Sequence, residues 1–60
     1  METFTAKQEA DMITALMDYA ERVLVTGGMS PAAWKRARRL CRLLNVTFDE
    51  VLDEALEGLR

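Results

Sequence analysis

Few side chains in this sequence belong to the types that carry out catalysis. The chain has no histidine, and Ser30 and Cys41 are its one serine and its one cysteine. Without histidine, a group titrates near neutral pH only when its surroundings perturb it, and a core this small hardly desolvates a carboxylate or a thiol. Ser30 precedes Pro31, which is typical of a helix cap, and paired carboxylates such as Asp49 and Glu50 suit the beginning of a helix. We therefore expect a protein that is not an enzyme, with no cofactor and no metal site.

The strongest chemical pattern is a run of five basic side chains with no acid between them. They are Lys35, Arg36, Arg38, Arg39 and Arg42. Basic groups at this density suit contacts with nucleic-acid phosphates, because they release condensed counterions, or contacts with an acidic protein surface. A solvated face, or a face paired with the acidic residues of 46–60, explains the same pattern. The sequence pI of about 4.9 counts against nucleic acid.

Helices must position these side chains, and the sequence marks where each helix begins and ends. The expected ranges are about 5–26, 31–44 and 47–58. Thr5 with Gln8 has the spacing of a capping box, and Thr47 with Glu50 repeats it. Ser30 caps the second helix, and a pair of glycines ends the first. These signals predict an all-α fold, with one helical domain over residues 1–60.

Apolar residues recur at intervals of three and four along the first helix and form a seam. Four of them are expected to hold two copies of the chain together: Ile13, Met17, Ala20 and Leu24. A domain of 60 residues buries only about 60% of the surface of its unfolded chain, so it needs further stabilisation. A lone thiol without histidine offers neither a disulfide nor a zinc site. The sequence therefore predicts a homodimeric bundle of helices.

The first 25 residues lack the features of a signal peptide, because acidic residues interrupt them and no long apolar run follows a basic start. The longest apolar stretches are a few residues, which is too short for a membrane span. We therefore expect a cytoplasmic protein that does not enter a membrane, and a reduced thiol at Cys41 fits that compartment.

Residues 30–59 resemble the helix pair of ribbon-helix-helix repressors and antitoxins. The resemblance lies in a basic amphipathic helix, a short Asn-Val-Thr break, and a capped helix that ends in Glu-Ala-Leu. It implies a dimer in which a strand before the helix pair enters the DNA major groove, and residues 22–26 are the one β-prone stretch at that place. The seam of the first helix instead predicts that residues 22–26 are its last turn.

The function that fits these observations best is the binding and modulation of a protein partner by a small helical homodimer. The alternative is a small dimeric DNA-binding regulator or antitoxin that uses the basic helix. Small phage and plasmid regulators have this style of composition, which is an analogy. Trp34 suits a binding hot spot, although its alignment with Ala37 and Cys41 favours a place in the core.

Overall fold

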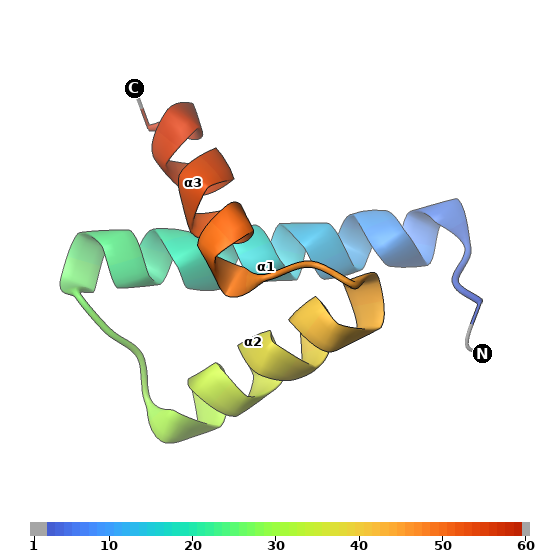
Figure 1. Ribbon diagram of the computed structural model, residues 1–60, viewed down its shortest axis with the longest axis horizontal. Helices are drawn as coiled ribbons and strands as arrows, with labels where there is room; N and C mark the ends of the chain where they lie inside the picture. The colour runs from blue at the N-terminus through green and yellow to red at the C-terminus, as the bar shows by residue number, and fades with distance from the viewer. Residues whose placement is uncertain (1–2, 60) are drawn as a thin grey trace.

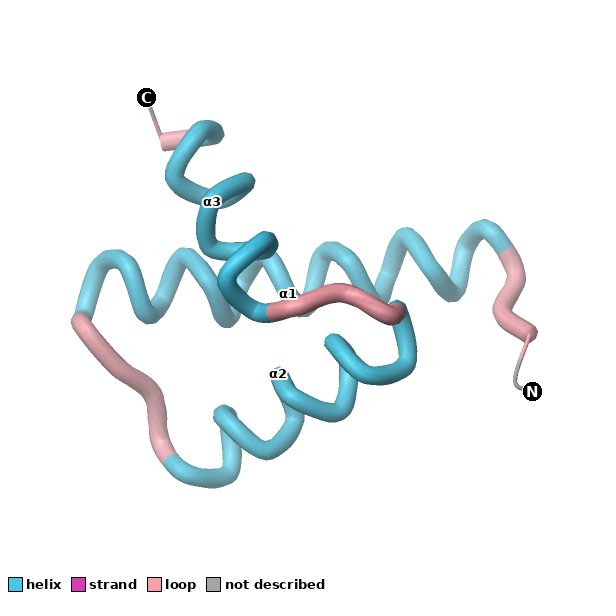
Figure 2. The backbone as a smooth tube through the Cα atoms, viewed as in Figure 1, coloured by secondary structure: helices cyan, strands magenta, loops and turns pink. Residues whose placement is uncertain are grey.

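The computed structural model describes residues 3–59 and contains three helices. They are α1 (Ala6–Thr26), α2 (Pro31–Leu44) and α3 (Phe48–Gly58). No strand occurs in this part of the chain, as Figure 2 shows. The prediction of an all-α fold of three helices is thus confirmed, and the expected ranges differ from the observed ones by one residue at the beginnings of α1 and α3.

The long helix α1 is the base on which the other two helices pack. In Figure 1, α2 lies below α1, whereas α3 crosses in front of α1 and extends above it. The helices α2 and α3 contact each other less than either contacts α1. Because α3 crosses α1 and then runs away from it, its C-terminal turns project from the body of the molecule. The result is a flat molecule of 34 × 27 × 16 Å.

Both ends of α1 are fixed by local signals in the sequence. The Thr5 hydroxyl accepts a hydrogen bond of 3.1 Å from the Gln8 amide, and the Gln8 side chain accepts one of 2.9 Å from the Thr5 amide. At the other end, Gly27 has φ 84°, the left-handed conformation that glycine adopts without steric cost. Residues 22–26 are the last turn of α1, as the seam predicted, because packing overrides their β-branched composition.

The turn between α2 and α3 is short and is also fixed by local hydrogen bonds. Asn45 ends α2 in the left-handed region with φ 57°, and the Val46 amide donates a 3.0 Å bond to the Cys41 carbonyl. The Thr47 hydroxyl then caps α3 by accepting from the Glu50 amide at 3.2 Å. A full capping box would also have the Glu50 side chain accept a hydrogen bond from the Thr47 amide. Here the Glu50 carboxylate accepts from the Thr47 hydroxyl instead.

The core is built mainly from alanine. The buried apolar residues are Leu16, Ala20, Ala33, Ala37, Cys41, Val51 and Ala55. Leu16 is the one large side chain among them that is fully buried, with 2% of its surface exposed. Each helix contributes one fully buried alanine to a common cluster, namely Ala20, Ala37 and Ala55. Such small side chains let the helices approach closely but bury little apolar surface.

Candidate binding surface on the second helix

The five basic side chains predicted as a contact surface all lie on α2 and are all exposed. Their exposure follows from the helix itself, because Ala33, Ala37 and Cys41 are spaced by four residues and turn one stripe of α2 into the core. Leu40 and Leu44 pack beside this stripe, and the rest of the helix surface is available to long polar side chains. The structure therefore brings the predicted residues onto one helix surface.

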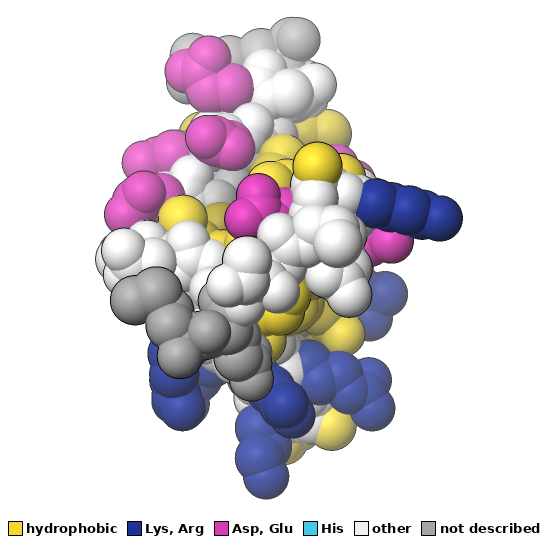
Figure 3. Space-filling view, turned by 90° about the vertical axis from the view of Figure 1, so that its right-hand side faces the viewer, with side chains coloured by type: hydrophobic (Ala, Val, Ile, Leu, Met, Phe, Trp, Pro, Cys, Tyr) yellow, Lys and Arg dark blue, Asp and Glu magenta, His cyan; other side chains and the backbone are white. Residues whose placement is uncertain are grey.

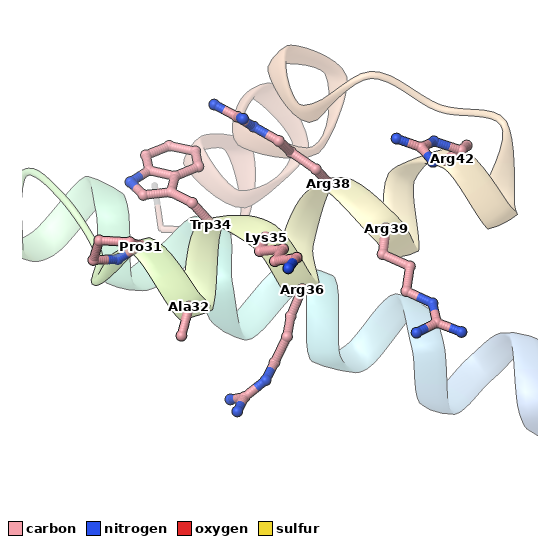
Figure 4. A pocket seen from close by; sticks show the side chains of 8 residues that line it. All are labelled: Pro31, Ala32, Trp34, Lys35, Arg36, Arg38, Arg39 and Arg42. Atoms are coloured by element: carbon pink, nitrogen blue, oxygen red, sulfur yellow. The ribbon is translucent and has the colours of Figure 1, made fainter.

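Figure 4 separates these side chains into two stripes along α2. Arg38 and Arg42 extend to one side, Arg36 and Arg39 extend to the other, and Lys35 lies between them. The spacing of Lys35, Arg38 and Arg42 is that of a single helix stripe, as is the spacing of Arg36, Arg39 and Leu43. We call the first the outer stripe and the second the inner stripe. The depression on this surface is lined by residues of α2 alone, so it is an open face and not an enclosed cavity.

Trp34 lies at the N-terminal end of the outer stripe and is half-buried, so the expected core position is only partly correct. Its ring packs edge-to-face on the ring of Phe48 in α3, with 5.2 Å between the centroids and 64° between the planes. One side of the indole is therefore fixed by α3, while the other remains accessible beside Pro31 and Arg38. The tryptophan is thus a rigid apolar group at the edge of a basic surface.

Acidic and basic side chains gather at opposite ends of the molecule. In Figure 3 the acidic side chains lie mainly in the upper part and most of the basic side chains lie in the lower part, with apolar side chains between them. The helix with the basic run carries no acid, and every charged side chain in α3 is acidic. The basic side chains of α2 are all exposed, so this surface is accessible to an external anion.

The four residues predicted as the dimer seam do not share one environment. Ala20 is fully buried within the single chain, so it presents no surface there. Ile13 and Leu24 remain 49% and 37% exposed, and Met17 is half-buried. The reason is that α2 and α3 cover the side of α1 that includes Leu16 and Ala20, and leave the adjoining flank open.

A second surface feature, which the sequence pattern did not reveal, is a groove of about 370 Å³ where the three helices meet. Its lining residues are Glu9, Ile13, Leu16, Met17, Leu43, Leu44, Asn45, Val46, Val51 and Glu54. The sequence does contain one sign of this groove. Leu43 is apolar, but it lies outside the apolar stripe of α2 and next to basic residues. The groove has an apolar floor and two carboxylates at its rim.

The remaining reactive group is Cys41, which is buried in the core as a free thiol, as predicted. Burial raises the pKa of the Cys41 thiol, since the interior disfavours the thiolate. Among residues 3–59, no three His, Cys, Asp or Glu side chains are grouped so that they could hold a metal ion. None of the described helices has the length together with the apolar composition needed to cross a bilayer.

Comparisons of the chain with protein-family models, with curated proteins and with solved structures found no match. The resemblance of residues 30–59 to ribbon-helix-helix proteins therefore stays a prediction, and it is confined to a helix pair because residues 22–26 are helical.

Proposed function

We propose that the protein is a small, non-enzymatic helical interaction protein that forms a homodimer and binds and modulates a protein partner. The contact surface is the outer stripe of α2 together with Trp34, and the surface that it recognises on the partner is acidic. The observation that carries this proposal is the placement of a half-buried tryptophan beside Lys35, Arg38 and Arg42 on one exposed face. The protein acts in the cytoplasm, where a buried thiol stays reduced.

Tryptophan and arginine are the residue types that dominate binding energy in protein interfaces. Trp34 supplies a flat apolar surface, and the edge-to-face contact with Phe48 fixes its ring before binding, so little side-chain entropy is lost on association. Arg38 and Arg42 lie one helix turn apart, and each guanidinium can donate two parallel hydrogen bonds to a carboxylate. An acidic patch with an apolar centre fits this arrangement.

The segregation of charge supports an encounter in one orientation. Since the acids lie mainly at the end of the molecule opposite α2, an acidic partner is attracted to one face and repelled by the other. Such charge complementarity mainly raises the association rate and the specificity of binding. Added salt screens the attraction and weakens both effects. A small protein with net charge −2 can thus recognise a negatively charged surface through one helix.

Duplex DNA is the alternative partner, because five exposed cations on one helix also suit phosphates. Residues 45–47 connect α2 to α3 in a short turn, as in helix-turn-helix proteins, which place the second helix of the pair in the major groove. Here that second helix carries only acids among its charged residues, namely Asp49, Glu50, Asp53, Glu54 and Glu57. Phosphates repel this helix, so a helix-turn-helix complex is disfavoured and DNA would have to be bound through α2 alone. The exposed side of Trp34 among the bases instead favours a protein surface.

Trp34 is the one tryptophan of the chain, so its fluorescence reports directly on the proposed surface. We expect a glutamate-rich peptide with one central leucine to change the Trp34 emission in a saturable, salt-sensitive manner, and a duplex DNA of equal charge to have a weaker effect. Arg38→Glu should abolish the response to the peptide. Lys7→Glu, which makes the same change in net charge on α1, should leave it intact.

Nuclease-treated cell lysate passed over the immobilised protein then tests the class of natural partner. Proteins retained by the wild type and by Lys7→Glu, but lost with Arg38→Glu, would support the proposal. Retention that disappears on nuclease treatment, or a tighter complex with duplex DNA than with the peptide, would replace it by the DNA-binding alternative. Equal binding by both variants would refute the assignment to the outer stripe.

A further inference from the structure

The face that contains the groove has three bands, each made by different parts of the fold. Its centre is apolar, where Ile13 and Met17 of α1 lie beside Leu43 at the end of α2. Two carboxylates, Glu9 of α1 and Glu54 of α3, lie at the rim of this centre. We call this surface the groove face.

The opposite edge of the groove face is basic. Arg36 and Arg39 belong to the same helix stripe as Leu43, because they precede it by seven and four residues. On one side of the molecule, Figure 3 shows acids mainly above, apolar side chains between them and the lower part, and most bases below. The face is therefore its own electrostatic complement when it is rotated by half a turn.

The apolar centre is also left uncovered in the single chain. Ile13 lines the groove and is 49% exposed, although it is one of the larger apolar side chains of α1. The core beneath is rich in alanine and holds Leu16 as its one fully buried large side chain, so it supplies little of the burial that a chain this short needs. Covering Ile13 and Leu43 would add apolar burial that the fold lacks.

We propose that a second copy of the chain docks on the groove face around a twofold axis. The apolar centres of the two copies pack on each other, and Glu9 and Glu54 of each copy face Arg36 and Arg39 of its partner. This inference rests on the homodimer in the proposed function and assigns it a surface. It keeps Ile13 and Met17 from the predicted seam, places Leu24 outside the interface, and adds the end of α2 and the beginning of α3.

A dimer of this kind leaves the outer stripe accessible. Trp34, Arg38 and Arg42 lie on the other side of α2 from Arg36 and Arg39 (Figure 4). The two copies then present two identical basic surfaces to a partner. Where a partner carries two acidic patches within reach, simultaneous contact strengthens binding without any new type of interaction.

Sedimentation equilibrium over micromolar concentrations tests the apolar centre. We expect the wild type to have twice the 6.8 kDa mass of the chain, and Ile13→Lys to raise the dissociation constant at least about tenfold, because it replaces apolar contact at the centre of the dimer by a hydrated ammonium group. Leu24→Lys and Val25→Lys serve as controls, since both residues lie outside the groove lining and Val25 is 76% exposed. Both controls should remain dimers with unchanged helical circular dichroism.

A charge-reversal pair tests the edges and does not depend on the apolar substitution. Arg36→Glu with Arg39→Glu makes both edges acidic, and Glu9→Arg with Glu54→Arg makes both edges basic. Each double variant should be a monomer alone, and an equimolar mixture should form a heterodimer, since every acidic edge then meets a basic one.

The outcomes separate this inference from the proposed function. A wild-type monomer would refute both the homodimer and its surface. A wild-type dimer that survives Ile13→Lys, that Leu24→Lys dissociates, or whose charge-reversed variants fail to pair would refute the groove face alone. Binding of the acidic peptide to the outer stripe, read from Trp34 fluorescence, is measured separately in each case.

Discussion

Leu16→Ala is expected to remove most of the stability of the folded chain. Leu16 is the largest fully buried side chain, and the residues buried around it are mostly small. Substitutions of buried leucine by alanine cost about 2–5 kcal/mol, and the cost is greatest where the neighbours cannot close the cavity. Since alanines on three helices set the distance between those helices, the site has little freedom to collapse, which places the loss toward the upper end of that range.

This loss is comparable with the whole stability of such a small domain, whose core rarely supplies more than roughly 3–5 kcal/mol. We therefore expect Leu16→Ala to be largely unfolded at 25 °C without denaturant. Leu56→Ala is the matched control, because it removes the same atoms from a leucine that is 43% exposed. The control should lose about 1 kcal/mol or less, since part of that side chain is already in contact with water.

The assay is urea unfolding followed by far-ultraviolet circular dichroism, with both variants at the same protein concentration, because the proposed dimer would gain stability with concentration. The wild type and Leu56→Ala should show a cooperative transition, and Leu16→Ala should show a sloping baseline or a midpoint close to zero urea. Similar midpoints for the two variants would refute the view that Leu16 dominates an otherwise alanine-rich core.

Three further predictions follow from the helix ends and the buried thiol. Thr5→Ala should lower the free energy of unfolding by about 1 kcal/mol and speed amide exchange in the first turn of α1, because it removes one hydrogen bond of the capping box. Asn45→Gly should preserve the urea midpoint while Asn45→Ala lowers the stability by about 1 kcal/mol, since the left-handed φ of 57° strains an alanine. Burial raises the pKa of Cys41 in the folded state, so the unfolded chain loses the thiol proton first. The stability of the folded state should therefore be constant below the ordinary thiol pKa and decline as pH rises through it. Cys41→Ala should lack this alkaline decline, and an identical dependence of stability on alkaline pH in the variant would contradict the prediction.

The helices were predictable from the sequence because their ends are set by neighbouring residues. Thr5 and Ser30 are followed by the spacing that an N-cap requires, and glycine or asparagine stands where each of the first two helices turns left-handed. Such signals act within a few residues and need no knowledge of tertiary packing. The same locality explains why the five basic residues were correctly expected together on one helix.

The side of α1 that faces the rest of the chain was not predictable in the same way. A seam at intervals of three and four shows that a face of the helix is apolar. Ala20 and Ile13 belong to the same seam, but Ala20 is fully buried and Ile13 is exposed. Their difference depends on where α2 and α3 cross α1, which is decided by contacts between residues far apart in the sequence. The groove could not be predicted for the same reason, since its lining comes from three helices.

The buried alanines also restrict how a chain of this fold can change in length. Ala20, Ala37 and Ala55 follow their N-caps Thr5, Ser30 and Thr47 by 15, 7 and 8 residues. One inserted residue between a cap and its alanine rotates the rest of the helix by about 100° and replaces the alanine in the core by a larger or charged side chain. A residue inserted between Gly27 and Ser30 lies in the loop and does not change the register of α1 or α2 relative to its own N-cap. Distant homologues of this chain are therefore expected to vary in length in this loop. An alignment that matches one small residue per helix is the way to detect such homologues.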